Sequence, residues 1–343
     1  MKKLWLYSVR FYIRLGLFFY YKTIKVVNAN AIPKNKPILF LSNHQNALMD
    51  ALLIATTCGR FSYFLTRASA FNNPIISKVL NSLQMYPVYR IRDGWGNLTN
   101  NNPIFDICTD LLKNNKSVVI FPEGDHNLKR TVRPLSKGFT RIVFDALEKF
   151  PDLDLQLLPV GLNFVHANRF GDSCSVHYGY PINANSFVGE ERNQAINDLR
   201  DAIHDRLCKL TTHIEEDQYE NTLQRLNKSE ADFLDPQAMN TCISNNFLEC
   251  DFQRKKTIPI LKAFLKGLLL VNLVVPYAIW KLFIEQKIEE EEFLSTFRFS
   301  VAISLVPIWI LTLVIILTSV HGFTVGLGYL LFVLSVVLLA IKT

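Results

Sequence analysis

A histidine and an aspartate six residues apart are the side chains of this chain that are best suited to acid–base chemistry. His44 follows the apolar run 37–42, and Asp50 lies on the helix-like segment after it. An imidazole titrates near neutral pH and can take a proton from an attacking hydroxyl. A neighbouring carboxylate can fix its tautomer and stabilise its charged form. We therefore interpret His44 as a general base and Asp50 as its partner, although an isolated pair of this kind is more often a helix-capping turn beside a solvated carboxylate.

Further groups with chemical potential follow along the chain. The sequence Phe-Pro-Glu-Gly occupies residues 121–124, directly after an apolar run. Arg90 and Arg92 follow a short strand-like segment, and a guanidinium binds phosphate through two parallel hydrogen bonds. Glu123 could accept a hydrogen bond from a hydroxyl, and Gly124 permits a tight turn. The alternative without a functional role is that each charged residue is a solvated surface charge or part of an ion pair at a strand end.

The order of these motifs resembles that of the glycerolipid acyltransferase family, which includes acyltransferases for 1-acyl-glycerol 3-phosphate and glycerol 3-phosphate. Asn43, His44 and Asp50 match its Asn-His…Asp motif, and residues 121–124 match its Phe-Pro-Glu-Gly motif. Two further motifs of the family have counterparts at 87–90 and 157–161. The resemblance covers roughly residues 30–180.

This resemblance implies that a fatty acyl group moves from a thioester, carried by coenzyme A or acyl carrier protein, to a hydroxyl. His44 would deprotonate that hydroxyl with Asp50 behind it, so that no acyl-enzyme forms. We expect no further cofactor and no metal, because His166 and His177 lie near no evident set of ligands. The residues expected to contact substrate are Asn43, Arg90, Arg92, Glu123, Gly124 and Lys137.

Two departures from the family leave the acceptor open. Five residues separate His44 from Asp50, where the family motif has four, and some glycerol-phosphate branches share this longer spacing. The family often continues its third motif with Thr-Arg-Ser, but Asp-His-Asn follows here at 125–127, so a cation expected near the acceptor phosphate is missing from its usual place. We interpret His126 as a loop histidine and not as a second base. Candidates for the missing cation are Lys129, Arg130, Arg133 and Lys137.

Short apolar runs alternate with helix-like segments from residue 32 to about 213, which predicts an α/β domain with a largely parallel mixed sheet flanked by helices. Functional groups of such sheets gather at the carboxyl ends of the strands, where His44 and Glu123 both fall. The predicted strands are 37–42, 61–66, 84–89, 117–121, 155–164 and 174–180. The predicted helices are 47–55, 74–83, 103–113, 137–150 and 190–214.

Both ends of the chain have the composition of membrane segments. Residues 1–28 are aromatic and apolar but contain two arginines, which predicts an amphipathic helix at the membrane interface. At the other end, 299–320 and 323–341 are uncharged and long enough to span a bilayer as a hairpin. A third segment, 258–284, has an uncharged core of only about fourteen residues, so it suits a re-entrant helix as well as a span.

These segments divide the chain into four parts. After the amphipathic helix we expect a catalytic domain at 29–214, a helical linker at 215–257 and a membrane region of two or three helices at 258–343. If only the hairpin spans, Arg298 and Lys342 lie on the side of the basic run 254–256, as the positive-inside bias requires. We therefore predict an integral protein of the cell membrane whose catalytic domain faces the cytoplasm, with six reduced cysteines.

Composition weighs against other classes of protein. The formal net charge of +7 suits an anionic membrane or substrate, but the basic residues are scattered and predict no nucleic-acid partner. A hydrolase lacks a Gly-x-Ser-x-Gly elbow, and a transporter would need more spans or oligomerisation. The partners predicted are membrane lipids and the acyl thioester, with the oligomeric state left open. The family resemblance implies a role in phospholipid biosynthesis, with 1-acyl-glycerol 3-phosphate as the default acceptor. The first alternative is transfer to glycerol 3-phosphate or a lysophospholipid. The second alternative is a non-catalytic, membrane-anchored lipid-binding protein.

Overall fold

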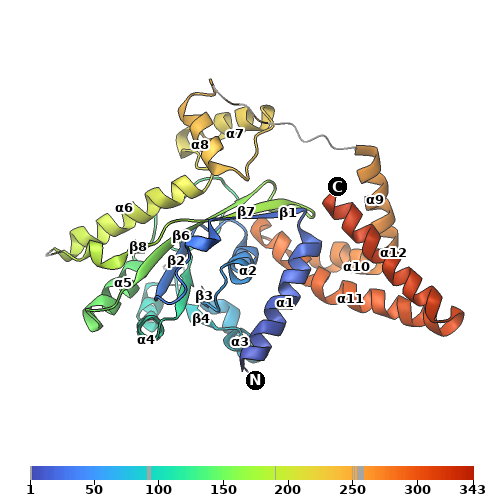
Figure 1. The fold of residues 1–343 in the computed structure, drawn as a ribbon, viewed down its shortest axis with the longest axis horizontal. Helices are drawn as coiled ribbons and strands as arrows, with labels where there is room; N and C mark the ends of the chain where they lie inside the picture. The colour runs from blue at the N-terminus through green and yellow to red at the C-terminus, as the bar shows by residue number, and fades with distance from the viewer. Residues whose placement is uncertain (1, 91–93, 190, 249, 251, 253–258) are drawn as a thin grey trace.

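The computed structural model describes the 343-residue chain except for residues 1, 91–93, 190, 249, 251 and 253–258 (Figure 1). In the described part, eight strands form one sheet in the order β1-β7-β6-β2-β5-β3-β4, with β8 beside β6. The strands are β1 (Thr23–Val27), β2 (Ile38–Ser42), β3 (Tyr63–Arg67), β4 (Met85–Val88), β5 (Ser117–Ile120), β6 (Gln156–Phe164), β7 (Ser173–Tyr178) and β8 (Ile182–Asn183). Only the pairings of β6 with β7 and β8 are antiparallel among these strands, which confirms the predicted largely parallel mixed sheet.

Helices cover both faces of this sheet. In β2, Phe40 packs on the face that carries α1 and α2, whereas Leu39 and Leu41 pack on the face that carries α4, α5 and α6. All three side chains are buried, as expected for a parallel sheet between two helical layers. The helices of this domain are α1 (Lys2–Tyr20), α2 (Ala47–Thr57), α3 (Pro74–Ser82), α4 (Asn102–Lys113), α5 (Gly138–Lys149) and α6 (Arg192–Leu210).

The strands predicted from apolar runs are all present, and their ends lie within two residues of the predicted ones. The predicted helix at 1–28 is too long, because α1 ends at Tyr20 and residues 23–27 form β1. β1 pairs in parallel with β7, so the sheet begins before residue 29, where the sequence placed the start of the domain. The alternation of Thr23–Val27 was hidden by the aromatic run before it.

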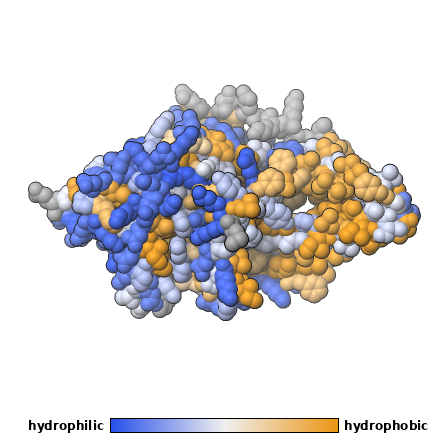
Figure 2. Space-filling view, turned by 60° about the horizontal axis from the view of Figure 1, so that its bottom comes forward, coloured by the Kyte–Doolittle hydropathy of each residue, from blue (hydrophilic) through white to orange (hydrophobic). Residues whose placement is uncertain are grey.

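The tail forms a helical hairpin beside the sheet domain. Helix α11 (Leu294–His321) and α12 (Phe323–Lys342) are long and apolar enough to cross a membrane. Helix α9 (Pro259–Asn272) meets α10 (Val274–Ile279) and the turns after it at a bend of 90°, which describes a broken span or a re-entrant loop. Figure 2 shows the apolar side chains gathered on the tail side of the molecule and the polar ones over the sheet domain.

Both ends of the hairpin meet the sheet domain. Lys342 donates to the backbone of Tyr21 at 2.8 Å, and Arg298 donates to the Asn168 carbonyl at 3.0 Å. The two cations thus lie on the same side of the hairpin, as the sequence predicted. The basic run 254–256, which the prediction also used, lies outside the described residues.

A small helical unit joins the domain to the tail. It contains α7 (Tyr219–Lys228) and α8 (Pro236–Ser244), and it has its own apolar cluster around Leu226 and Met239. Cys242 and Cys250 form a disulfide in this unit, so the expectation of six reduced cysteines is wrong for these two. Their spacing of eight residues gave no signal, because only the turn after α8 brings the two Cα atoms to 5.3 Å.

Candidate active site

The loops after β2 and β5 form the site, because these two strands are parallel neighbours. Leu41 lies opposite Ile120, so both chains leave the sheet at the same edge. His44 follows β2 and Glu123 follows β5, and the His44 amide faces the Glu123 carboxylate at 3.4 Å. The sheet topology therefore brings together two residues that are 79 positions apart.

His44 and Asp50 form a close pair. Nδ1 of His44 lies 2.8 Å from Oδ2 of Asp50, which is fully buried in the first turn of α2. The carboxylate can only accept here, so it holds the proton on Nδ1 and leaves the lone pair on Nε2. No hydrogen bond joins Nε2 to any other described residue, and the ring is partly exposed at 17%. The pair thus has the geometry of a general base with an orienting carboxylate.

The turn between these two residues absorbs the extra residue of their spacing. Asp50 Oδ2 also accepts from the backbone amides of Gln45 and Asn46, each at 2.7 Å. Helix α2 begins only at Ala47, whose φ of 41° is a left-handed conformation that an alanine adopts at a cost of about 1 kcal/mol or more. The carboxylate therefore organises the loop as well as the imidazole.

Two buried asparagines fasten this loop to the rest of the domain. The Asn43 amide donates to the Leu162 carbonyl at 3.0 Å and accepts from the Leu162 amide at 2.8 Å. Asn46 donates to the Ala167 carbonyl at 2.8 Å. Because Leu162 occupies both polar atoms of Asn43, we assign Asn43 a positioning role in place of the substrate contact predicted from the sequence.

The loop after β5 supplies a platform for the imidazole. The ring of Phe121 stacks on that of His44, with centroids 4.1 Å apart and an interplanar angle of 19°. Gly124 has a φ of 73°, which glycine adopts without the steric cost that a side chain would add, and this confirms the tight turn predicted there. The first residue of the motif thus packs against the candidate base and the last one turns the chain.

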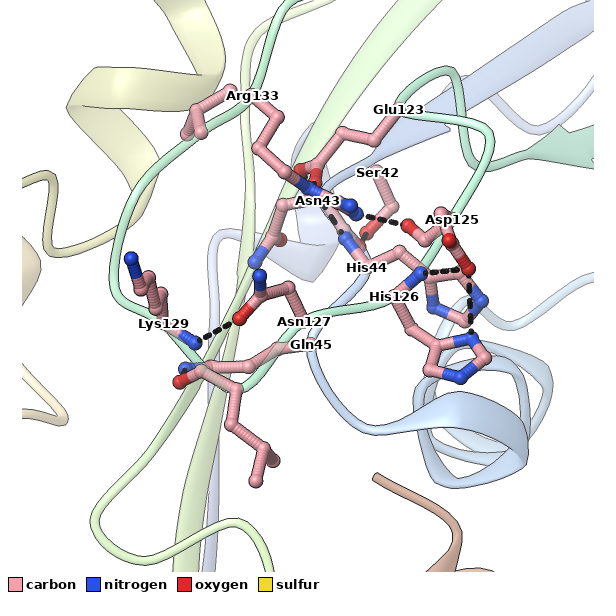
Figure 3. A network of polar contacts seen from close by, with 12 residues as sticks. Ser42, Asn43, His44, Gln45, Glu123, Asp125, His126, Asn127, Lys129 and Arg133 are labelled. Carbon is pink, nitrogen blue, oxygen red and sulfur yellow. Dashed lines mark hydrogen bonds and ion pairs between the residues drawn. The ribbon is translucent and has the colours of Figure 1, made fainter. Parts of the chain in front are cut away.

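Glu123 pairs with Arg133 below the surface. Nε of Arg133 lies 2.8 Å from Oε2 of Glu123. Figure 3 shows the two side chains pointing toward each other. Burial raises the pKa of the Glu123 carboxyl to about 7, although the Arg133 guanidinium pulls it down. Arg133 also donates to the Asp125 carbonyl, so its guanidinium contacts the loop after β5 at both Glu123 and Asp125.

His126 lies beside His44 and not on an open loop. The two ring centroids are 5.5 Å apart, and Figure 3 shows the imidazoles side by side. Asp125 contacts this group through the backbone amide of His126 at 2.9 Å and faces Nη1 of Arg90 at 3.3 Å. Burial lowers the pKa of His126, and the neighbouring His44 lowers it further, so the neutral form dominates near pH 7.

The membrane tail reaches this same group. Nε2 of His126 lies 3.0 Å from Oε2 of Glu290, just before α11, and Phe293 meets the His126 ring edge-on. His126, Glu290 and Glu292 place ligand atoms within 4.8 Å of one another, as a metal site would. We place no metal there, because Glu290 is half exposed and such acidic groups commonly gather without an ion.

Comparison with known proteins agrees with this geometry. The family model named Acyltransferase matches residues 23–163, which hold β1 to β5, most of β6 and both site loops. Residues 23–163 are thus similar to an acyltransferase domain, and curated glycerolipid acyltransferases are among the relatives of this chain. Glycerol-3-phosphate O-acyltransferase 1 of Saccharomyces cerevisiae is 30% identical to this chain over 106 residues, which are 29% of this chain and 14% of the yeast protein.

Two further relatives complete the comparison. An uncharacterized acyltransferase of Schizosaccharomyces pombe is 30% identical over 99 residues, or 27% of this chain and 15% of that protein. The chain thus spans only about one seventh of the length of these curated relatives. The crystal structure of the 1-acyl-sn-glycerophosphate acyltransferase PlsC from Thermotoga maritima aligns with 60% of this chain and 80% of that one, at 18% identity and a TM-score of 0.43.

The other cations suggested by the sequence have different places in the acyltransferase domain. Arg130 donates to the carbonyls of Phe164 and Val165, at 2.7 and 2.8 Å, and is therefore a structural residue. The ammonium of Lys129 lies over the Tyr219 ring. Lys137 is exposed just before α5, with no ion pair to the described site residues. Arg92 lies outside the described residues.

Several site residues escaped the sequence reasoning. His126 was interpreted as a loop residue, and no local pattern links it to Glu290, which is 164 residues away in the chain. Arg133 was one of four candidate cations with no feature to select it. The position of His126 two residues after Phe-Pro-Glu-Gly was a usable signal, since a residue that close to the motif must lie near the sheet edge.

Proposed function

We propose that this protein transfers a fatty acyl group from a thioester donor to a hydroxyl of a glycerol-phosphate-type acceptor. The observation that carries the proposal is the contact of 2.8 Å between His44 and Asp50 at the carboxyl end of β2, beside the Phe-Pro-Glu-Gly loop. The match of residues 23–163 to the acyltransferase family model supports the same reaction. The donor would be acyl-coenzyme A or acyl carrier protein.

In this mechanism the acceptor hydroxyl itself is the nucleophile. Nε2 of His44 takes the hydroxyl proton as the oxygen attacks the thioester carbonyl, and Asp50 stabilises the imidazolium. The tetrahedral intermediate collapses to an ester, the carbon–sulfur bond breaks, and the imidazolium returns its proton to the departing thiolate. One ester and one free thiol result, and no covalent acyl-enzyme is required.

The acceptor phosphate needs a cation close to His44. Arg90 and Arg133 both reach the 121–126 loop, through Asp125 and Glu123, so we expect their guanidinium groups to face the phosphate. Arg133 would then replace the arginine that the family often carries directly after Phe-Pro-Glu-Gly. This role is a charge contact with the acceptor and leaves the proton transfer to His44.

The acceptor that we propose first is 1-acyl-glycerol 3-phosphate. A tail with two helices long enough to span a membrane supports a lipid acceptor, because the site lies against that tail through Glu290. Glycerol 3-phosphate is the second candidate. It is supported by the longer spacing from His44 to Asp50 and by the printed activity of the two yeast relatives, glycerol-3-phosphate O-acyltransferases 1 and 2.

We further propose that the protein resides in the cell membrane with the catalytic domain on the cytoplasmic side. Arg298 and Lys342 support this orientation, since both flank the hairpin on the domain side. Cytoplasmic ends of spans carry the excess of lysine and arginine. The thioester donors named above are also cytoplasmic molecules.

The decisive experiment uses the full-length protein in liposomes with radiolabelled palmitoyl-coenzyme A or palmitoyl-acyl carrier protein. Glycerol 3-phosphate, 1-acyl-glycerol 3-phosphate and lysophosphatidylcholine serve as acceptors, and the products are separated by chromatography. We expect a labelled ester that His44→Ala reduces by about 100-fold or more, the scale of general-base catalysis. His321→Ala, at the exposed end of α11, is the matched control and should keep full activity.

The other possible results would indicate different functions. Labelled free fatty acid in place of an ester would identify a hydrolase. No product with any donor and acceptor, from protein that is folded and inserted, would favour the non-catalytic lipid-binding alternative. Full activity of His44→Ala would remove His44 from the mechanism, whatever the acceptor.

A further inference from the structure

A large cavity lies between α1 and the helices of the tail. Its volume is about 780 Å³, which is within the range of small-molecule sites. The wall is mainly apolar, and all lining residues lie outside residues 23–163, which match the acyltransferase family. Its apolar lining includes Leu15 and Phe19 from α1, Val306 and Leu311 from α11, and Leu330 and Leu334 from α12.

The polar part of this wall is positively charged. Arg169, Lys266, Lys281 and Arg298 line the cavity together with a single carboxylate, Glu285. That carboxylate forms an ion pair with Lys281 at 2.5 Å. Arg298 donates to a backbone carbonyl and lies over the Trp280 ring, and no carboxylate of the described residues forms an ion pair with Arg169, Lys266 or Arg298. Asp172 lies near enough to Arg169 for their charges to interact, but none of these three cations is held in an ion pair within the described residues.

An apolar cavity whose wall carries cations without ion-pair partners is suited to an anionic amphiphile. Water does not fill an apolar cavity well, and unpaired cations near apolar walls favour an anion as partner. The cavity lies among helices that are long enough to span a membrane, where phospholipids are the abundant molecules with an apolar chain and an anionic head. A free phosphate ion would leave the apolar part empty, and a neutral lipid would leave the charge unbalanced.

We propose that this cavity binds an anionic phospholipid, with an acyl chain between α1, α11 and α12 and its phosphate against Arg169, Lys266 and Arg298. The site is separate from the catalytic pair and does not depend on acyl transfer. It adjoins the catalytic loop through one short segment. The Ala167 carbonyl accepts from both Asn46 and Ser295, and the next carbonyl, of Asn168, accepts from Arg298. A bound lipid would therefore hold the tail against the loop that carries His44.

The test uses the full-length protein in phosphatidylcholine nanodiscs that contain a small fraction of phosphatidic acid with a photoreactive acyl chain. After irradiation, labelled peptides are identified by mass spectrometry. We expect label on the cavity-lining stretches of α1, α11 and α12, and we expect unlabelled phosphatidic acid to reduce it while added phosphatidylcholine does not. Label spread evenly over the outer faces of α11 and α12, with no such competition, would overturn the proposal.

Two variants sharpen the result, each with a matched control. Val306→Trp fills the cavity from α11, whereas Ile308→Trp adds the same group at a position that is 61% exposed on that helix and does not line the cavity. Arg169→Gln with Lys266→Gln removes two cations of the wall, and Lys262→Gln removes a cation of α9 that does not line it. We expect both cavity variants to lower labelling about tenfold or more. The loss of one charge-assisted hydrogen bond has this effect on binding, and a tryptophan that occupies the place of the acyl chain should have at least the same effect.

The two kinds of variant separate the parts of the proposal. Unchanged labelling in the double glutamine variant would overturn the anionic headgroup, even if Val306→Trp blocks the chain. Unchanged labelling in folded Val306→Trp protein would overturn the cavity as the binding place. If Val306→Trp fails to insert, the double glutamine variant and the competition experiment still decide. Loss of acyltransferase activity plays no part in either readout.

Discussion

Glu290 of the membrane tail and His126 of the sheet domain are in direct contact, with Oε2 and Nε2 3.0 Å apart across 164 residues of chain. His126 in turn lies against His44, with ring centroids 5.5 Å apart. His126 thus lies between Glu290 of the tail and the candidate base, His44. The tail is therefore part of the wall of the site as well as a membrane anchor, and its position can influence the protonation of His126.

Glu290→Gln should lower the pKa of His126 further. The carboxylate favours the protonated imidazole, while burial and the neighbouring His44 oppose it. A neutral amide removes the favourable charge and leaves the opposing terms in place. The measurement is a pH titration by NMR of protein with ¹³C-labelled histidine. Glu289→Gln, at the adjacent exposed position, is the control, and an equal effect of both variants would contradict a specific contact.

Asp50→Asn should reduce kcat strongly while KM changes little. The variant keeps the size of the side chain but loses the charge that fixes the tautomer of His44, and such a loss lowers turnover by about 100-fold to 10,000-fold. Steady-state kinetics with the acceptor identified above provide the measurement. If Asp50 acts through His44, adding Asp50→Asn to His44→Ala should cost little more. A full multiplicative loss in the double variant would show that the two residues act independently.

The buried carboxyl of Glu123 makes stability depend on pH. Its pKa is raised from 4.5 to about 7, so between these values the folded protein holds a proton that the unfolded chain releases. Stability should therefore fall as the pH rises through this window, by on the order of 3 kcal/mol for this one group. Thermal unfolding at pH 5 and pH 7.5 would show a smaller difference in Tm for Glu123→Gln than for the natural protein.

The control for this experiment is Glu148→Gln, since Glu148 is exposed on α5. It should keep the pH dependence of the natural protein. A Tm difference that is the same in all three proteins would mean that Glu123 is not the group responsible. No fall of stability between pH 5 and pH 7.5 in the natural protein would contradict the raised pKa, because an ordinary or lowered pKa would confine the pH dependence of this group to lower pH.

Gly161→Ala should destabilise the domain. A Cβ at this position of β6 would lie 2.1 Å from the carbonyl oxygen of Leu210, at the end of α6, so the helix and the strand must separate. Overpacking against backbone costs about 2 kcal/mol or more. Gly189→Ala is the control, because nothing lies within 4 Å of its Cβ and its φ is ordinary. Equal Tm values for the two variants would contradict the close packing of α6 on β6.

The sequence alone determined the sheet domain, because its apolar runs form the strands, and the central strands β2, β5 and β6 are buried on both faces. The alternation of these strands with helical segments predicts a largely parallel sheet. It also places His44 and Glu123 at the carboxyl edge of that sheet. The motifs around these residues are local, so their resemblance to the glycerolipid acyltransferases could be seen without the fold. Strand β1 was missed because five residues after a long aromatic helix carry too little pattern.

Tertiary structure decided which side chains complete the site. Glu290 and His126 meet only because the tail folds back against the carboxyl edge of the sheet, and no local pattern encodes a contact across 164 residues. Only the folded loop distinguishes Arg133 from the three other candidate cations, because it places the Arg133 guanidinium 2.8 Å from the Glu123 carboxylate. The cavity between α1 and the tail arises from the packing of helices from both ends of the chain, since each helix alone shows only an apolar face.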